Sequence, residues 1–299
     1  MSQGVAIRVV HMYYSSRHAS SLLRARRQPS QHKVTRVLIL LPPSEGKAAP
    51  ARGKRLQLDR LSSPSLYGPR AEVLDALVDL CTTDGADRLT HAAHVLGVGK
   101  TQTDEVTRNA GLSSARTGRA DHIYTGVLYE ALGLPSLEGA AKRRATSSIA
   151  IISSLFGLVR PADRIPAYRL SGDVTLPGIG TIATYWRRVL DQAVLETAGK
   201  GLIVDLRSTT YAGFWRPDPS TAHRVVTIRV LHEVNGRRQV VSHFNKATKG
   251  RIVRAVLENG GNPSTPKKLA VHLERIGWDV ELDAPSRHGT QLDVVVSDL

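Results

Sequence analysis

The stretch that decides the fold runs from residue 149 to residue 211. It holds two short apolar segments, each followed at once by polar or basic residues. The first, Ile149-Ala-Ile-Ile-Ser153, continues into Ser154-Leu-Phe-Gly157-Leu-Val-Arg160-Pro161 and on to Tyr168-Arg169-Leu170. The second, Leu202-Ile-Val-Asp-Leu206, continues into Arg207-Ser-Thr-Thr-Tyr211. Apolar runs without alternation predict strands buried on both faces, and ligand sites of open α/β sheets lie just past such strands.

The rest of the chain supplies further strands and the helices to cover them. Strands are also predicted at residues 37–41, 225–231, 239–243, 278–282 and 291–296, and Asn235-Gly236 predicts a hairpin turn. Helices are predicted at 71–80, 86–95, 127–132 and 181–197, and further helices begin within residues 244–251 and at residue 265, whereas 135–147 indicates a linker. We expect a mixed α/β (α+β) fold: one compact domain over residues 37–299, with a central mixed sheet flanked by helices and a helix-hairpin-helix insertion at about 71–112.

The charge of the chain indicates a polyanionic partner. Its 299 residues include 41 Lys and Arg against 26 Asp and Glu, which gives a formal net charge of +15. Residues 1–36 hold seven of the basic residues and none of the acidic ones, and their weak patterning predicts a disordered extension, with a natural start near Val34 or Val37. The body keeps a surplus of eight positive charges, which favours nucleic acid, phosphorylated metabolites or an acidic surface as partner.

Thiol and metal chemistry have little support in the sequence. Cys81 is the only cysteine, which suits a reducing cytoplasm, and we expect it to pack as a small apolar residue. Only His91 and His94 have helical ligand spacing, and no carboxylates or thiols lie beside them in the sequence. No apolar run approaches the roughly 20 residues of a membrane span. We expect a cytoplasmic monomer without a metal or a cofactor.

The segment after the first predicted strand is a candidate anion site. It reads Pro42-Pro43-Ser44-Glu45-Gly46-Lys47. A Gly-Lys pair after a strand is typical of phosphate loops, but the GxxxxGK[ST] spacing is missing, so a P-loop triphosphatase is excluded. Ser44 and Lys47 nevertheless follow a strand end, where they are positioned to contact an anion. The alternative is a solvated turn.

A glycine-containing turn between two predicted helices has two interpretations. Val95-Leu96-Gly97-Val98-Gly99-Lys100-Thr101 matches the helix-hairpin-helix pattern, in which glycines let the backbone approach a DNA phosphate. Against this, Thr101-Gln-Thr-Asp104 is a capping box followed by Glu105, and these carboxylates would satisfy the same backbone donors and repel phosphate. A plain turn in a helical hairpin therefore stays equally open.

A second basic segment begins a predicted helix. Phe244-Asn-Lys246-Ala-Thr-Lys249-Gly250-Arg251 leads into an amphipathic stretch that carries Arg254. Basic residues at a helix start oppose the helix dipole. Their presence is easier to understand if an anion binds there.

These segments together resemble the YaaA family of bacterial peroxide-stress proteins, also known as DUF328 or UPF0246. The resemblance rests on motifs in the same order, over about residues 37–283. They are Pro43-Ser-Glu-Gly-Lys47, Tyr124-Thr-Gly126, Ser153-Ser-Leu-Phe-Gly-Leu-Val-Arg-Pro161, Tyr168-Arg-Leu170, Tyr185-Trp186, Asp205-Leu-Arg-Ser208 with Tyr211, and Val241-Ser-His-Phe-Asn-Lys-Ala-Thr-Lys-Gly250 with Arg254.

The resemblance implies an α/β fold with a helix-hairpin-helix element, a basic cleft, binding to duplex DNA without sequence preference, and a role in limiting damage by hydrogen peroxide and iron. The chain departs from the family pattern in its acid-free N-terminal extension and in two further places. It has Asn245-Lys-Ala where a Lys-Lys pair is commoner, and Arg207-Ser-Thr-Thr where an acidic residue often precedes the aromatic.

The candidate residues for binding DNA or another anion come from these segments. They are Ser44, Lys47, Gly97, Gly99, Lys100, Arg160, Tyr168, Arg169, Arg207, Ser208, Tyr211, Lys246, Lys249 and Arg254. Because most of them follow strand ends or begin a helix, we expect the sheet to bring the basic ones to one edge, where Lys and Arg would neutralise phosphates.

Two other functions and one structural alternative stay open. An enzyme for a phosphorylated or nucleotide-like molecule could use Ser44, Ser208 or Tyr211 as nucleophile or acid, and Lys47 or Lys246 as base. Direct iron binding has weak support because the histidines are scattered. The structural alternative is that each arginine pairs with a carboxylate and fixes a loop.

Overall fold

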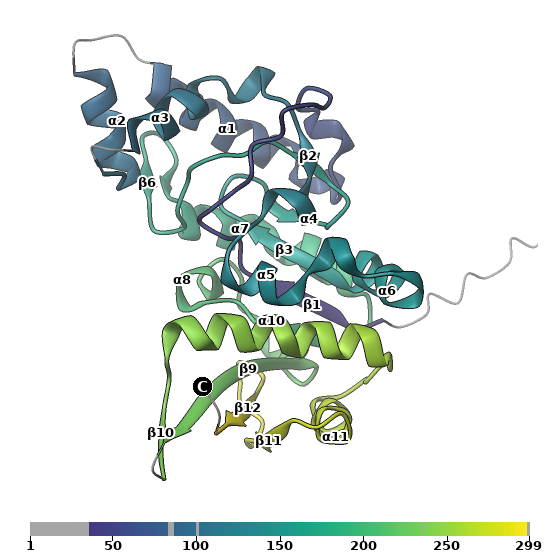
Figure 1. The fold of residues 1–299 in the computed structure, drawn as a ribbon. Coiled ribbons are helices and arrows are strands. Elements are labelled where there is room, and N and C mark those ends of the chain that lie inside the picture. Colours follow the sequence, from purple (N-terminus) through teal and green to yellow (C-terminus); the bar gives the residue numbers. More distant parts are fainter. Residues whose placement is uncertain (1–35, 83–86, 100–101, 235, 298–299) are drawn as a thin grey trace, which may run out of the picture. The chain divides into compact units, whose positions relative to one another are not determined.

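The structure is a computed structural model that describes residues 36–82, 87–99, 102–234 and 236–297. The extension predicted at residues 1–36 lies outside this range except for Arg36. In the described part a mixed sheet of eight strands has the order β11-β12-β9-β8-β1-β3-β4, with β10 paired to β9 (Figure 1). The strands are β1 (Leu38–Leu41), β3 (Ile149–Ser153), β4 (Gly157–Val159), β8 (Ile203–Asp205), β9 (Val225–Val234), β10 (Arg237–Gln239), β11 (Asp279–Leu282) and β12 (Thr290–Val296).

The middle of the sheet is parallel and its edges are not. Strands β3, β1, β8, β9 and β12 run in the same direction, whereas β4 is antiparallel to β3 and β11 is antiparallel to β12. Every residue of β1, β3 and β8 is buried. This burial explains why these strands read as continuous apolar runs, since helices or loops cover both faces of a parallel sheet.

Helices of very different length surround the sheet. They are α1 (Tyr67–Thr82), α2 (Arg88–Leu96), α3 (Thr103–Ala110), α4 (Ala120–Ile123), α5 (Val127–Leu132), α6 (Gly139–Ser148), α7 (Ile182–Ala198), α8 (Thr209–Ala212), α9 (Pro219–Ala222), α10 (Ser242–Asn259) and α11 (Pro266–Arg275). Two small antiparallel ladders pair β2 (Gly118–Arg119) with β5 (Arg164–Ile165), and β6 (Thr175–Leu176) with β7 (Gly180–Thr181).

One face of the sheet is covered by α10 and α11. Ile39, Val204 and Ile228, from three neighbouring strands, line the same apolar space as Val253 of α10 and Leu273 of α11. Helix α10 crosses this region as the long green helix of Figure 1, next to α5. These side chains form part of the single hydrophobic core of the described body.

The close approach of α10 to α5 requires a glycine. A Cβ on Gly250 would lie 2.3 Å from the carbonyl oxygen of Leu128 and 2.9 Å from the Cβ of Ala131. Real Cβ atoms do not approach other heavy atoms so closely, so a larger residue would push the two helices apart. The glycine of the Lys249-Gly250 motif thus has a packing role.

The helical insertion predicted at about 71–112 is present as a bundle of α1, α2 and α3, which pack against one another. Cys81 is buried in α1 as a free thiol, as expected, and burial raises its pKa to about 11. The glycine turn after α2 makes this a helical hairpin. A helix-hairpin-helix that binds DNA stays a prediction.

Two predicted segments were wrong. Residues 135–147 form α6 for most of their length instead of a linker. The second arm predicted at 239–243 is β10, which ends at Gln239, and α10 begins at Ser242, before the helix start predicted within residues 244–251. Both helices lack a large apolar stripe, because α6 buries only Ala145 and the first part of α10 buries Thr248 and Gly250.

The described segments contain no helix that is long and apolar enough to cross a membrane. They also contain no group of three or more His, Cys, Asp or Glu side chains arranged to hold a metal ion.

Candidate functional site

The connections that follow two neighbouring parallel strands, β1 and β8, lead to opposite sides of the sheet. Strand β1 connects onward to β3 on one side, whereas β8 connects onward to β9 on the other side. Such a topological switch point leaves a crevice outside the carboxyl ends of the two strands, and open α/β sheets bind ligands there. Residues 42–47 and 206–211 leave the sheet at this place. Both segments were singled out from the sequence.

Lys47 lies at this edge with its amine turned inward. Its backbone bridges to Tyr124, and its Nζ donates to the carbonyl oxygens of Ser44 at 2.9 Å and Glu45 at 3.3 Å. The same Nζ lies 4.2 Å from the ring centre of Tyr168. Burial, reinforced by a nearby arginine charge, lowers the pKa of the Lys47 ammonium to about 7. A substantial fraction of this amine is therefore neutral near pH 7.

A buried hydrogen-bond chain surrounds this amine. The Tyr168 hydroxyl lies 2.8 Å from Ser153 Oγ and 3.1 Å from the Tyr124 hydroxyl. Ser153 Oγ also accepts a hydrogen bond from the backbone N–H of Phe156 at 3.0 Å. Burial raises the pKa of the Tyr168 hydroxyl, so the phenol stays protonated and neutral at physiological pH. The tyrosines can donate hydrogen bonds but carry no charge.

Arg169 completes the group. Helix α3 fixes its backbone: Asn109 Nδ2 donates to the Arg169 carbonyl at 2.7 Å, and the Arg169 N–H donates to Asn109 Oδ1 at 2.9 Å. Its Nη1 lies 3.9 Å from Glu45 Oε2. Within the described chain its Nε is buried without a hydrogen-bond partner. We call Lys47, Tyr124, Ser153, Tyr168 and Arg169 the sheet-edge site.

Arg207 lies at the same switch point but is held by the protein. Its Nε and Nη2 donate to the two carboxylate oxygens of Asp205 at 2.8 and 2.7 Å, and Nη1 and Nη2 donate to the carbonyls of Tyr211 and Trp215. Although burial alone would raise it, the Arg207 guanidinium holds the pKa of the Asp205 carboxyl below its usual value. Arg207 thus has the structural role that the sequence analysis kept as an alternative: it pairs with a carboxylate and fixes a loop.

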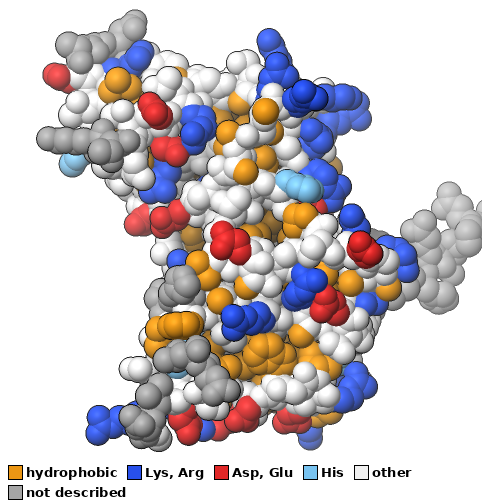
Figure 2. Space-filling model, in the orientation of Figure 1, with side chains coloured by type: hydrophobic (Ala, Val, Ile, Leu, Met, Phe, Trp, Pro, Cys, Tyr) orange, Lys and Arg blue, Asp and Glu red, His pale blue; other side chains and the backbone are white. Residues whose placement is uncertain are grey.

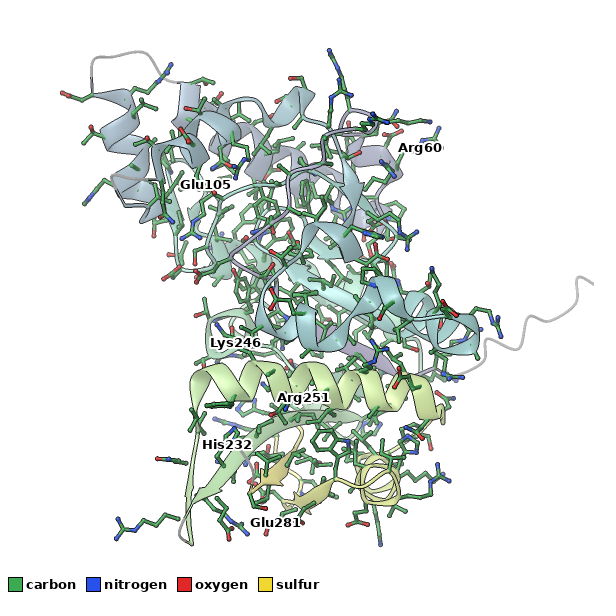
Figure 3. All side chains as sticks on the ribbon, in the orientation of Figure 1. Arg60, Glu105, His232, Lys246, Arg251 and Glu281 are labelled. Carbon is green, nitrogen blue, oxygen red and sulfur yellow. The ribbon has the colours of Figure 1, made fainter. Side chains whose placement is uncertain are left out.

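Two lysines of α10 differ in exposure. Lys249 is half-buried, and its Nζ donates to the carbonyls of Leu206 at 3.2 Å and Arg207 at 3.4 Å. Burial lowers the pKa of Lys249, and the nearby Asp205 opposes this shift. Lys246 is exposed (Figure 3) and is free to meet an external anion. Lys249 therefore packs against the segment that follows β8, whereas Lys246 is on the surface.

Arg160 lies at the other edge of the sheet, so the expectation that all the basic residues gather at one edge was wrong. Its Nη1 donates to the carbonyl of Ile149, the first residue of β3, at 3.1 Å. The physical reason is the direction of β4, which pairs antiparallel with β3 and returns the chain to the amino end before Arg160. Asp163 Oδ2 also accepts from the Arg160 backbone N–H at 2.8 Å.

Arg254 is also away from the switch point. Its Nη1 donates to the carbonyl of Leu132 at 3.1 Å and to Ser136 Oγ at 3.0 Å, which binds α10 to the end of α5. Its Nη2 pairs with Glu258 Oε1 at 2.9 Å. These contacts arise because α10 begins at Ser242, which places Arg254 about three turns into the helix instead of near its start.

The glycine turn is only partly described. Helix α2 ends where Gly97 adopts a left-handed conformation with φ 61°, and the N–H of Gly99 donates to Gln102 Oε1 at 3.3 Å. Lys100 lies outside the described residues. Asp104 and Glu105 occupy the first turn of α3, but the N-cap of this helix is Gln102, without a side-chain cap hydrogen bond, instead of the predicted Thr101. Both interpretations of this turn therefore stay open.

The remaining candidates have small local roles. Ser44 Oγ donates to the Gly46 carbonyl and accepts from the Thr125 N–H at 3.1 Å, so it shapes the turn that carries Lys47. Ser208 is exposed before α8. The Tyr211 ring packs on Phe214 with a centroid distance of 5.0 Å, and burial raises its hydroxyl pKa.

The sequence missed three contributors to the site. Ser153 appeared as the last residue of a strand and in a family motif, and Tyr124 only in a family motif, so neither was a candidate site residue. Asn109 carried no signal, because its role depends on α3 folding back onto residue 169.

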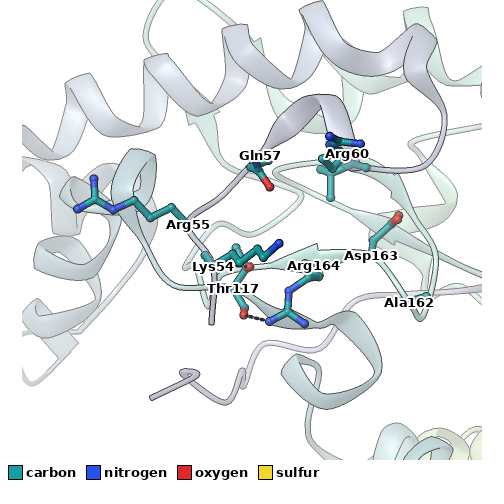
Figure 4. Close-up of a pocket in the computed structure, with 9 residues that line it drawn as sticks. Lys54, Arg55, Gln57, Arg60, Thr117, Ala162, Asp163 and Arg164 are labelled. Carbon is teal, nitrogen blue, oxygen red and sulfur yellow. Dashed lines mark hydrogen bonds between the residues drawn. The ribbon is translucent and has the colours of Figure 1, made fainter. Parts of the chain in front are cut away.

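A second basic feature lies away from the switch point. A pocket of about 130 Å³ is lined by Lys54, Arg55, Gln57, Arg60, Leu61, Thr117, Ala162, Asp163 and Arg164 (Figure 4). We call it the basic pocket. In Figure 3 Arg60 marks its region at the upper right, apart from Lys246.

Comparison with known proteins agrees with this arrangement. A family model described as peroxide stress protein YaaA matches residues 37–281, which cover the strands from β1 to β10, the insertion and the sheet-edge site. The chain belongs to the YaaA family.

Curated relatives of this YaaA-family chain match over most of their length. A UPF0246 protein of Streptomyces coelicolor is 48% identical over 265 residues, which is 88% of this chain and 100% of the relative. A UPF0246 protein of Corynebacterium efficiens is 38% identical over 252 residues, covering 83% of this chain and 96% of the relative. Another from Corynebacterium glutamicum is 36% identical over 224 residues, covering 74% and 84%.

Proposed function

We propose that this YaaA-family protein acts in the cytoplasm during peroxide stress by binding duplex DNA without sequence preference. The observation that supports DNA binding is the unbalanced positive charge of the body: beyond residue 36 the chain has 34 Lys and Arg and 26 Asp and Glu. DNA carries a dense line of phosphates, and a protein that neutralises them gains free energy by releasing counterions. Binding of this kind needs no base contacts.

The exposed basic side chains are better placed for this role than the buried ones. Arg207 is fully engaged with Asp205, and Lys47 faces inward. Figure 2 shows Lys and Arg gathered at the upper right of this face, in the region of Arg60. The exposed basic residues of the segments that form this region are Arg52, Lys54, Arg55, Arg60, Arg116 and Arg164. Lys246 and the turn of Gly97, Gly99 and Lys100 are proposed as further contacts.

A salt series tests DNA binding. Affinity for a short duplex is measured by fluorescence anisotropy, for the full chain and for the chain without residues 1–36, with two unrelated sequences. With four phosphate contacts, affinity falls roughly 150-fold between about 50 and 200 mM salt. Both sequences are expected to give the same slope, and the chain without residues 1–36 is expected to keep a steep slope of its own. An affinity that does not change with salt, or that vanishes with the N-terminal segment, contradicts the proposal.

The effect on iron is proposed to be indirect. DNA bound to the protein is less accessible to radicals that iron generates from peroxide, and no iron site is needed. The test is the iron content of protein purified without added metal. One iron per chain would contradict an indirect role.

A second candidate function is chemistry on a phosphorylated or nucleotide-like molecule in the sheet-edge site. The specific observation is Lys47, whose pKa is lowered to about 7 beside the unpaired Nε of Arg169 and the hydroxyl of Tyr168. A partly neutral amine can accept a proton at pH 7, while an arginine and a phenol hold an anion. Lys47 also lies at the switch point, which is where open α/β sheets bind their ligands.

Native mass spectrometry separates the two candidates. The freshly purified full chain is compared with Lys47→Arg, which keeps the positive charge and removes the amine that titrates near neutrality. A retained small molecule that is lost from Lys47→Arg supports the enzyme. Binding of DNA, in contrast, is expected to be the same for both proteins, because Lys47 faces the interior.

A further inference from the structure

The basic pocket is walled by three chain segments that are far apart in the sequence. Residues 54–61 form one wall, Thr117 precedes β2, and Arg164 begins β5. Figure 4 shows Lys54 between Arg60 and Arg164, whose guanidinium turns to the Thr117 carbonyl, whereas Arg55 extends away from the pocket. The pocket lies outside the switch point. None of its residues was a candidate in the sequence analysis.

Hydrogen bonds fix the walls of the basic pocket. The Thr117 N–H and its Oγ1 both donate to the Lys54 carbonyl at 2.9 Å, and Arg55 bridges to Arg116 through the backbone. Arg164 Nη2 donates to the Thr117 carbonyl at 2.7 Å. The backbone positions that carry the charges are thus set before any ligand arrives, which lowers the entropy cost of binding.

The positive charges of the basic pocket lack carboxylate partners. Within the described chain, Lys54, Arg55 and Arg164 form no ion pair, and Arg60 has only the exposed Asp59 at 3.9 Å. Asp163 is the one carboxylate among the lining residues, and it is already engaged. Its Oδ1 accepts from the N–H and Oγ of Ser62, at 3.0 and 2.8 Å, and its Oδ2 accepts from a backbone N–H.

The size of the basic pocket restricts its ligand. Pockets that hold a whole drug-sized molecule measure roughly 300 Å³ or more, so about 130 Å³ admits a small group instead of a complete nucleotide. Guanidinium and ammonium groups around a small opening match the oxygens of a phosphate, which accepts several charge-assisted hydrogen bonds at once.

From this juxtaposition we propose that the basic pocket binds one phosphate group, held by Lys54, Arg60 and Arg164. The phosphate can belong to a DNA backbone or to a free phosphate compound. A phosphate from DNA as the ligand rests on the proposed function. The free source does not.

The experiment compares two double variants of the full chain that remove the same charge. Lys54→Gln with Arg60→Gln alters the basic pocket and leaves its backbone hydrogen bonds intact. Lys142→Gln with Arg143→Gln, both exposed on α6, is the matched control. Each protein is titrated with a short DNA duplex over a salt series and with inorganic pyrophosphate by calorimetry. Circular dichroism confirms that both variants fold.

If the phosphate belongs to DNA, the pocket variant lowers the salt slope of duplex binding by about 0.9 relative to the control, the value for one lost phosphate contact. If it belongs to a free compound, the pocket variant loses pyrophosphate binding and keeps the duplex slope. Loss of pyrophosphate binding in a protein that never binds DNA would reject the proposed function and keep the pocket. Equal behaviour of the two variants with both probes overturns the pocket.

Discussion

Gly157 is a residue whose place in a sequence motif has a packing cause. It begins β4 with a φ of 69°, and a Cβ added there would lie 2.6 Å from the Trp186 ring. Trp186 is fully buried, and its Nε1 donates to the Ser154 carbonyl at 2.7 Å. The indole therefore cannot move aside without losing this bond. The glycine of the Gly157-Leu-Val-Arg160-Pro161 segment thus leaves room for the buried Trp186 ring.

Gly157→Ala is expected to reduce the free energy of unfolding by about 2–5 kcal/mol, because it adds backbone strain to a steric clash. Urea unfolding followed by tryptophan fluorescence measures it. Gly178→Ala is the control, because Gly178 also has a positive φ of 74° but has open space around it. The control isolates strain, which costs about 1–2 kcal/mol. Equal losses in the two variants would show that Trp186 is not the cause.

Asp205→Asn tests the architectural role of the buried pair at the switch point. The change keeps the shape of the side chain and leaves the Arg207 charge without its partner in a buried place. We expect a loss of about 3–5 kcal/mol in the free energy of unfolding, measured by chemical denaturation. Glu281→Gln, in an exposed pair with Arg238, is expected to leave the midpoint unchanged. An Asp205→Asn protein as stable as the original would contradict the architectural role of the pair.

At the scale of elements, a single buried arginine joins α1 to the sheet. Arg70 is completely buried, and its guanidinium donates to the carbonyls of Phe156 at 2.9 Å and Leu158 at 2.7 Å, on either side of the β4 start. It also donates to the carbonyls of Ser62 at 2.7 Å and Ser63 at 3.3 Å. Burial lowers its pKa to about 10, so it stays charged at physiological pH.

Arg70→Met is expected to lower the free energy of unfolding by about 3–5 kcal/mol, because several buried carbonyls lose their donors. Thermal and urea unfolding measure the loss. Arg187→Met is the matched control: Arg187 is exposed, and its Nε donates to one carbonyl, that of Gly213. If both variants lose the same small amount, the four carbonyls do not depend on Arg70.

The elements that were predicted well from the sequence are those whose buried positions hold apolar side chains. β3 was predicted residue for residue, and α7 nearly so, because aliphatic and aromatic residues fill their buried positions. α6 was missed, and the first residues of α10 were predicted as strand, because small or polar residues face the interior in both helices. Arg70 was missed for a related reason, since a charged residue next to a predicted helix normally indicates solvent.

At the scale of the whole molecule, the sequence predicted where chain segments leave the sheet but not in which direction each strand runs. Ser44, Lys47, Arg207 and Tyr211 follow β1 and β8, and they do lie near the switch point. Arg160 does not, because one antiparallel strand reverses the chain before it. Strand direction depends on pairing between distant segments, which local patterns do not contain. The basic pocket was not predicted for the same reason, because its lining residues come from segments that are far apart in the sequence.

The stability of the whole body is expected to fall on mild acidification. His232 and His272 are buried, and burial lowers the pKa of both imidazoles, with Arg275 adding to the shift at His272. Below about pH 6.5 the unfolded chain binds protons at these histidines before the native protein does. Protonation therefore favours unfolding in this range.

Urea unfolding at about pH 6.5 and about pH 5 measures this effect, and the midpoint is expected to be lower at the acidic value. His232→Phe removes one of the titrating groups and should flatten the dependence. The exposed His91 provides the control, since His91→Gln is expected to leave the dependence as it is. An unchanged slope in His232→Phe would assign the acid sensitivity to other groups.

The burial of Cys81 has a consequence for a protein of a peroxide-stress family. Sulfur is oxidised through its thiolate, and a thiol with a pKa near 11 inside a helical bundle holds almost none of that form. With no other cysteine in the chain, the protein has no exposed sulfhydryl for hydrogen peroxide to convert. Cys81 is therefore expected to stay reduced when hydrogen peroxide meets the folded protein.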